Sequence, residues 1–235
     1  MYAALIDSAE RFFSSEQADA LRIFHGRGHR FPGLEHLSVD WFAPIVLITT
    51  YDEIEQPERL AEILLRSDTL SQIKCVLLQY RKRKGTPCDC LYGEPLHHTI
   101  VTEAGLQYEV QPGVNQNAGL FLDMAPLRRW LRDHSTNKNV LNLFAYTCSL
   151  SIAALAGEAR QVVNVDMSKP SINWGLRNHQ LNNQDPRCVR SVPHNLFRSW
   201  GRIKQFGRYD TIIIDPPTRQ RGSFDAEKNL SLIHI

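Results

Sequence analysis

Short apolar runs along the chain alternate with longer segments in which apolar positions recur every three to four residues. The short runs predict buried strands, at 45–50, 75–80, 108–110, 140–144, 161–165, 188–192 and 211–214. The longer segments predict amphipathic helices, at 7–24, 57–67, 124–134, 149–156 and 169–182. After Gly113 the two kinds of element alternate regularly, which indicates parallel βαβ units.

The same pattern divides the chain. Before Pro112, helices and strands are mixed without regular alternation, so we expect residues 1–112 to form a small α+β accessory domain. Residues 113–235 predict an α/β domain with a Rossmann-like sheet, of which the first four strands are recognisable. The length of 235 residues suits two such domains.

Composition adds limits on location and partners. Apolar residues make up 43% of the chain and the net charge is +2, which permits a nucleic-acid partner without requiring one. The apolar start at residues 1–6 is followed by Asp7 and Glu10, so it predicts neither a signal peptide nor a membrane span. The five scattered cysteines favour a reducing compartment. We therefore expect a cytoplasmic protein with no membrane partner.

A chemical signal follows the last apolar run. Thr211–Ile214 is followed by an acid, two prolines and a threonine, Asp215, Pro216, Pro217 and Thr218. Proline lacks the N–H that a strand ladder needs, so the chain must turn where this strand ends. Open α/β sheets bind ligands at the carboxyl ends of their strands. An acid and an exposed carbonyl at this place suit catalysis on an amino group or on the edge of a nucleobase.

Two further strand ends suit a nucleoside. Residues 144–149 form a loop that opens a helix, and such a loop presents backbone N–H groups to a ligand. Asp166 ends the next strand, twenty positions after Tyr146, and an acid at that spacing usually accepts hydrogen bonds from ribose hydroxyls. A dinucleotide would need glycine in the loop for close approach to its pyrophosphate, and residues 144–149 contain none. S-Adenosyl-L-methionine carries no phosphate, so we expect it as the cofactor.

Four segments share a joint pattern: Leu-Asn-Leu-Phe-Ala-Tyr-Thr at 141–147, Gln-Val-Val-Asn-Val-Asp-Met-Ser at 161–168, Asn-x-x-Leu-Asn at 178–182 and Asp-Pro-Pro-Thr at 215–218. Together they resemble the class I methyltransferases that modify large-subunit ribosomal RNA, including the cytosine carbon-5 and guanine nitrogen-7 enzymes. The segment 115–124 is similar to the stretch that precedes the first strand in that family and helps to close the cofactor pocket. The resemblance covers about residues 113–224.

The resemblance implies roles for individual residues. Asp166 would bind the ribose of S-adenosylmethionine, although it could instead simply cap the following helix. Asn195 would face the adenine amine, where the family usually has an acid. The residues that would border the target base as the catalytic group are Asp215, Pro216, Pro217 and Thr218. The other implied cofactor contacts are Phe121, Asp123, Phe144, Tyr146, Thr147, Cys148, Ser149, Met167 and again Asp215.

The sequence also departs from the family pattern. Cys148 stands where the family commonly has glycine, and Arg219 stands where it often has an aromatic residue. The family sheet has seven strands, and residues 229–235 show no start of the last three. We therefore expect a C-terminally truncated domain in which the strand 211–214 becomes an exposed edge.

Three other features have alternative interpretations. The group Cys88, Cys90, His97 and His98 invites a zinc site, but its spacing matches no common ribbon or finger, so we expect no metal. The basic segments 22–30 and 81–84 are either solvated turns or contacts for RNA phosphates. Cys148 is better suited to packing than to nucleophilic attack.

The leading expectation is therefore an S-adenosylmethionine-dependent methyltransferase that acts on a base in RNA, and the resemblance makes that RNA ribosomal. Methylation of a protein or a small molecule stays open, because an Asp-Pro-Pro turn tolerates any planar nitrogen nucleophile. A remnant that binds RNA or cofactor without turnover also stays open. Cys148, Asn195 and the missing strands favour that last interpretation.

Overall fold

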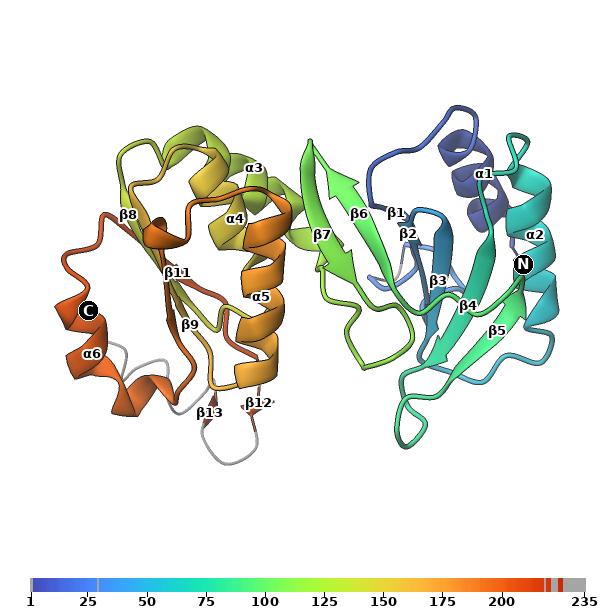
Figure 1. Ribbon diagram of the computed structural model, residues 1–235. Coiled ribbons are helices and arrows are strands. Elements are labelled where there is room, and N and C mark those ends of the chain that lie inside the picture. Colours follow the sequence, from blue (N-terminus) through green and yellow to red (C-terminus); the bar gives the residue numbers. More distant parts are fainter. Residues whose placement is uncertain (1, 29, 218, 221–223, 226–235) are drawn as a thin grey trace. The chain divides into compact units, whose positions relative to one another are not determined.

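The structure is a computed structural model that describes residues 2–28, 30–217, 219–220 and 224–225. The chain forms two units, Met1–Met124 and Ala125–Ile235 (Figure 1). The division falls after Met124 rather than near Pro112, because the segment between them is bonded to the first unit. Gln79 Nε2 donates to Asn115 O at 2.9 Å, and Arg81 Nη2 donates to Asn117 Oδ1 at 3.3 Å.

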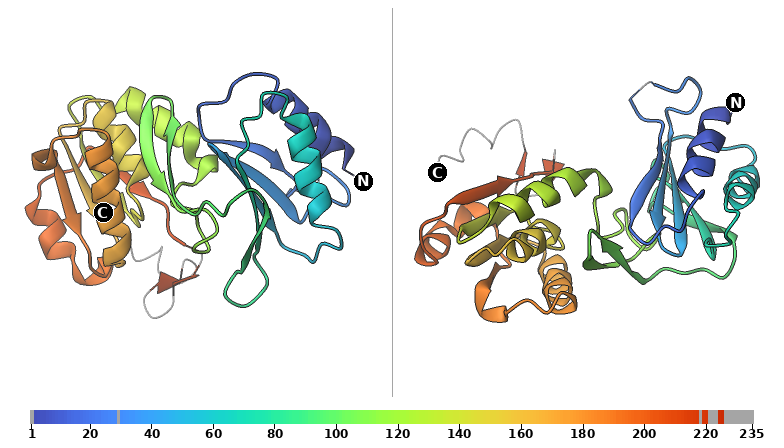
Figure 2. Two further views of the ribbon diagram at one scale, coloured as in Figure 1. Left: turned by 45° about the vertical axis from the view of Figure 1, so that its right-hand side comes forward. Right: turned by 90° about the horizontal axis from the view of Figure 1, so that it is seen from above.

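A five-stranded mixed sheet forms the centre of the first unit, in the order β1 (Leu21–His25), β2 (Leu37–Phe42), β3 (Ile45–Thr50), β4 (Cys75–Tyr80) and β5 (Cys88–Tyr92). Only β3 and β4 run parallel, and α2 (Glu58–Ser67) makes the crossover between them. Both α1 (Ala3–Phe12) and α2 pack on one face of this sheet (Figure 2). A hairpin of β6 (Thr99–Glu103) and β7 (Leu106–Val110) follows.

The predicted helix over 7–24 is wrong. The helix α1 ends at Phe12, the chain turns over residues 13–15, and β1 begins at Leu21. Among the bonds that hold this exit, Ser14 Oγ donates to Arg11 O at 2.8 Å, and Trp41 Nε1 donates to Gln17 O at 3.0 Å. Pairing with β2 then overrides the helical spacing of the apolar residues.

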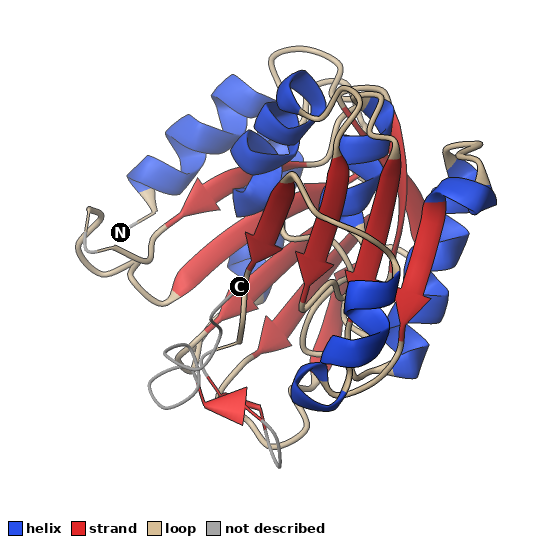
Figure 3. Cartoon of the chain, turned by 90° about the vertical axis from the view of Figure 1, so that its left-hand side faces the viewer, coloured by secondary structure: helices blue, strands red, loops and turns tan. Residues whose placement is uncertain are grey.

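The second unit contains a four-stranded parallel sheet, as predicted, in the order β10 (Val189–Val192), β9 (Gln161–Val165), β8 (Asn139–Leu143) and β11 (Thr211–Ile214) (Figure 3). After β8, the chain adds β9 and then β10 on one side of β8, and it then places β11 on the other side of β8. This reversal is the switch point at which open α/β sheets form a crevice beyond their strand ends.

Helices cover both faces of this sheet, and they are α3 (Ala125–His134), α4 (Ser149–Ala156), α5 (Lys169–Leu181) and α6 (Trp200–Gln205). Leu141 and Val163 pack with Ile203 of α6 on one face, whereas Asn142 bonds to Ser151 of α4 on the other. The short elements are the 3-10 turns Leu122–Met124, Pro186–Cys188 and Leu196–Arg198 and the strands β12 (Arg219–Gln220) and β13 (Phe224–Asp225).

Within the described residues, β11 pairs only with β8. Its side chains Ile212 and Ile214 are 36% and 42% exposed. Among the described residues, every helix is too short or too polar to span a lipid bilayer.

A chain of buried polar side chains crosses the interior of the second unit. Asn142 Nδ2 donates to Ser151 Oγ at 2.9 Å, and Ser151 Oγ donates to Asn164 Oδ1. Asn164 Nδ2 lies 3.4 Å from His179 Nε2, and His179 Nδ1 lies 2.6 Å from Gln184 Oε1. These contacts fit a neutral imidazole that accepts at Nε2 and donates from Nδ1. The network joins β8, α4, β9 and α5.

Candidate functional site

The carboxyl ends of the four parallel strands bring most of the predicted residues of the second unit to one edge of the sheet. The loop 144–149 follows β8, Asp166 follows β9, Asn195 follows β10 and Asp215 follows β11. Because β8 lies between β9 and β11, the loop is flanked by the two acids. The edge therefore combines backbone N–H donors with carboxylate acceptors.

The loop 144–149 has an unusual backbone. Phe144, Tyr146 and Cys148 have φ values of 58°, 47° and 63°, in the left-handed region that side chains disfavour. Hydrogen bonds on both sides fix this course. The N–H of Ala145 donates to Val165 O at 3.0 Å, and Asn178 Nδ2 donates to Thr147 O at 3.2 Å.

Asp166 connects the loop to the next helix. Its Oδ2 accepts from the N–H of Tyr146 at 2.9 Å, and its Oδ1 accepts from the N–H of Ser168 at 2.8 Å. The N-cap of α5 is Ser168, whose Oγ accepts from the N–H of Ser171, so Asp166 orders the turn before α5 and does not cap the helix itself. Each carboxylate oxygen can accept a second hydrogen bond, so the predicted contact with ribose hydroxyls remains open.

The side chain of Cys148 occupies space that Gly175 of α5 leaves free. This side chain is 1% exposed and packs with Ala145 and Ile172. A Cβ atom placed on Gly175 of α5 would lie 2.3 Å from Cys148 Sγ and 2.9 Å from Cys148 Cβ. The missing side chain of Gly175 therefore provides the space for the cysteine. Burial raises the pKa of the Cys148 thiol, with a further contribution from Asp166, which keeps it protonated and unsuited to nucleophilic attack.

The substitution Gly175→Ala is expected to lower the free energy of unfolding by about 2 kcal/mol. Overpacking against Cys148 costs up to about 3 kcal/mol, which exceeds the gain in helix propensity of about 1 kcal/mol. Urea unfolding measures the change. Adding Cys148→Gly should restore most of the loss, because the next close atom, Thr147 C, lies at 3.1 Å.

Gly201→Ala in α6 is the matched control, since a Cβ there meets nothing within 4 Å. It should raise the free energy of unfolding by up to about 1 kcal/mol. A Gly175→Ala protein as stable as the Gly201→Ala protein would contradict the packing of Cys148 against α5.

Sequence reasoning assigned no role to two residues that the structure places at this edge. Arg128 of α3 is 2% exposed, and its Nη1 lies 3.5 Å from Ser149 Oγ at the start of α4. Asn178 is fully buried and holds the loop through Thr147. The signal for Arg128 was its spacing of three from the buried Leu131, which puts a charged group on the buried face of the helix.

The remaining predicted residues have mixed outcomes. Asn195 Oδ1 accepts from the N–H of Phe197 at 2.9 Å, so the side chain caps a 3-10 turn. Met167 is 41% exposed beside Asp166. Thr218 lies outside the described residues. Phe121 and Asp123 belong to the first unit, and their contact with a cofactor stays a prediction.

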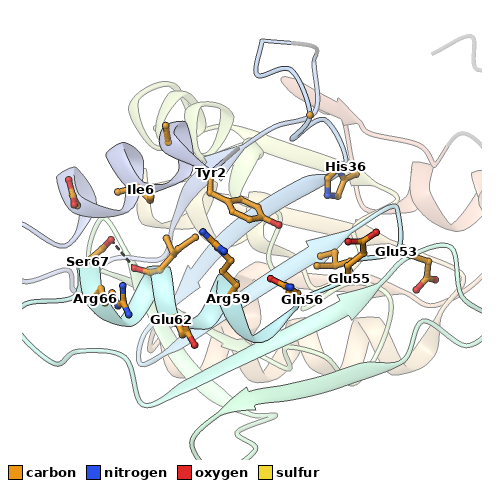
Figure 4. A pocket seen from close by; sticks show the side chains of 15 residues that line it. Tyr2, Ile6, His36, Glu53, Glu55, Gln56, Arg59, Glu62, Arg66 and Ser67 are labelled. Atoms are coloured by element: carbon orange, nitrogen blue, oxygen red, sulfur yellow. Dashed lines mark hydrogen bonds between the residues drawn. The ribbon is translucent and has the colours of Figure 1, made fainter.

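A cleft of about 1080 Å³ lies in the first unit, beside α1 and α2. Tyr2 and Ile6 come from α1 and its start, Arg59 and Glu62 come from α2, and Glu53 comes from the loop before α2 (Figure 4). None of the residues predicted for the site lines it. In the part of the chain that the structure describes, no group of three His, Cys, Asp or Glu side chains is placed to hold a metal ion.

Comparisons with known proteins agree with the resemblance found in the sequence. The family model for S-adenosylmethionine-dependent methyltransferases matches residues 21–233. The ribosomal RNA large subunit methyltransferases K/L of Hahella chejuensis and Shewanella amazonensis are 29% and 30% identical over 88% and 94% of this chain. The chain spans only about a third of those relatives, 29% and 32%. The solved structure of SMU.776 complexed with SAH is 25% identical with a TM-score of 0.79, over 97% of this chain and 60% of that one.

Proposed function

The chain belongs to the S-adenosylmethionine-dependent methyltransferase family, and from this premise we propose that it transfers a methyl group from S-adenosylmethionine to a base in RNA. The family and its cofactor are those predicted from the sequence. The observation that carries the proposal is the edge of the parallel sheet, where Asp166, the loop 144–149 and Asp215 follow adjacent strands. The relatives named as ribosomal RNA methyltransferases support RNA as the substrate.

The donors and acceptors at this edge fit the cofactor. Asp166 keeps acceptor capacity for the ribose hydroxyls, and the exposed Met167 offers an apolar surface for the adenine ring. The first turn of α4 directs N–H groups and the positive end of the helix dipole toward a carboxylate. The buried Arg128, next to Ser149, adds a guanidinium for the same carboxylate. Together they would hold the methionine moiety.

The remaining residues would orient the substrate. When bound, S-adenosylmethionine supplies a sulfonium methyl group, which an atom of the base displaces in line while the carbon–sulfur bond breaks. Asp215 is exposed beyond β11, so its carboxylate would accept from an amino group of the base, and the carbonyl of Pro216 would accept beside it. Positioning of this kind supplies much of the rate in transfer reactions. All five cysteines are free, which supports our placing the protein in the cytoplasm.

Methyl transfer from S-adenosylmethionine labelled at the methyl group tests the proposal. With total cellular RNA and total protein offered together, we expect label in RNA. Asp215→Asn should lower the rate about 10- to 100-fold, because the charged acceptor is lost.

Asp210→Asn is the matched control at the opposite end of the same strand, where Asp210 Oδ2 accepts from the N–H of Asn139. It should leave the rate unchanged. Label confined to protein would overturn RNA as the substrate class.

A further inference from the structure

A recess of about 250 Å³ lies in the first unit, on the face of the five-stranded sheet that α1 and α2 leave uncovered. Residues of β1 to β4 line it together with the segment 116–123. The two basic segments 22–30 and 81–84, far apart in sequence, both contribute side chains to it. Its lining is more polar than apolar, so a polar ligand suits it.

Three guanidinium groups line the recess, and each uses only part of its hydrogen-bonding capacity within the described residues. Arg22 donates from Nε to Asp40 Oδ1 at 2.6 Å and from Nη2 to Asp40 Oδ2 at 3.3 Å. Arg27 Nη1 donates to Tyr51 Oη at 3.0 Å. Arg81 donates from Nη2 to Asn117, and its Nε is buried without an acceptor. A guanidinium carries five N–H donors, so most of these donors remain for a ligand.

The charge balance of the recess is positive. Asp40 is matched by Arg22, and Asp123 is the other acid among its lining residues. His25 also lines the recess, and its pKa is lowered by burial and then by the charges of Arg22 and Arg27. The imidazole therefore experiences the positive potential that an anionic ligand would meet.

We propose that this recess binds a backbone phosphate of an RNA strand. The inference rests on the proposed function, and it names a contact between the first unit and the substrate. Guanidinium forks match phosphate oxygens in geometry and charge. The segment 116–123 that lines the recess also carries Phe121 and Asp123 and leads into α3. A strand held here is anchored on the same stretch of chain that is predicted to contact the cofactor.

Two of the basic residues that follow Arg81 are engaged elsewhere. Lys82 Nζ pairs with Asp52 Oδ1 at 2.8 Å. Arg83 pairs with Glu53, and its guanidinium lies 3.6 Å from the centre of the Tyr80 ring. Lys84 is exposed and does not line the recess. Arg27 and Arg81 are therefore the proposed phosphate ligands. Lys84 carries the same charge outside the recess and serves as the control residue.

Fluorescence anisotropy with a labelled single-stranded RNA, measured over a series of salt concentrations, tests the assignment in the full chain. Arg27→Gln and Arg81→Gln should each weaken binding several-fold and reduce the slope of log affinity against log salt by about 0.7, the value for one lost phosphate contact. Lys84→Gln should behave as wild type. Affinity for S-adenosylhomocysteine should not change in any variant.

Several outcomes would overturn the inference. Wild-type RNA binding in both arginine variants would do so, as would an equal loss in Lys84→Gln. Because Arg27 is exposed, its substitution tests the recess even if Arg81→Gln fails to fold. Competition by micromolar cytidine monophosphate would instead make the recess a mononucleotide site. A wild-type protein that binds S-adenosylhomocysteine but not RNA refutes the recess, whereas one that binds neither refutes the proposed function itself.

Discussion

Asp166→Ala is expected to lower the affinity for S-adenosylhomocysteine by at least about 100-fold. The substitution removes the acceptor proposed for the ribose hydroxyls and releases the N–H of Tyr146 from its bond of 2.9 Å. Hydrogen bonds to a charged group contribute about 1.5–3 kcal/mol each, and about 1.4 kcal/mol corresponds to a factor of ten in affinity. Titration calorimetry of the purified chain measures the change.

Two variants separate the ribose contact from the local turn. Asp185→Ala removes a comparable bond, from the N–H of Arg187 to Asp185 Oδ1 at 2.8 Å, at the turn before β10, on the edge of the sheet opposite the carboxyl ends of its strands. It should leave the affinity unchanged. Asp166→Asn keeps one acceptor oxygen and should give an intermediate loss. An Asp166→Ala protein with wild-type affinity would eliminate the ribose assignment and leave Asp166 only the role of ordering the loop and the turn before α5.

The free energy of unfolding is expected to fall by about 3 kcal/mol when the pH drops from about 6.5 to about 4. Burial lowers the pKa of His179 to about 4, and the bond to Gln184 offsets only part of this effect. Between these pH values the unfolded chain binds a proton at His179 that the folded chain does not. The neutral imidazole therefore makes its full contribution to the free energy of unfolding above about pH 6.5 and loses it on acidification. That contribution is about 1.4 kcal/mol for each unit by which the folded pKa lies below the unfolded pKa.

Urea unfolding at a series of pH values checks this expectation. His179→Gln should remove most of the pH dependence in that range, because the titrating group is absent. His194→Gln removes an exposed histidine and should leave the dependence in place. If His179→Gln retains the wild-type slope, another group is responsible for the acid sensitivity, and the buried network does not require a neutral His179.

The parallel sheet was predictable because its strands stand out as apolar runs, and its two central strands β8 and β9 are buried along almost their whole length. Its strands Gln161–Val165 and Thr211–Ile214, like Ile45–Thr50 in the first unit, begin and end where the sequence places them. The helix predicted over 7–24 was wrong because the local pattern there does not match the structure. Its second half has apolar residues at helical spacing, and only pairing with β2 reveals that Leu21–His25 is a strand. Local spacing does not contain that information.

Some residues of the site could likewise be predicted from the sequence, and others could not. Asp166 and the loop 144–149 follow strands directly, so their position at one edge could be inferred from chain order. Arg128, Asn178 and Gly175 act through α3 and α5, which approach the loop only in the folded unit. The boundary after Met124 was missed because bonds from Gln79 and Arg81 attach the segment before it to the first unit.

The contact between Cys148 and Gly175 constrains the order in which these positions could have changed during evolution. With a larger residue at 175, a cysteine at 148 would press against the helix, so glycine at 175 favours the cysteine. Now that the cysteine is present, regaining a side chain at 175 carries the cost of about 2 kcal/mol expected for Gly175→Ala. A route to this chain through glycine at both positions avoids that cost, and a reversion avoids it when the loop changes before the helix.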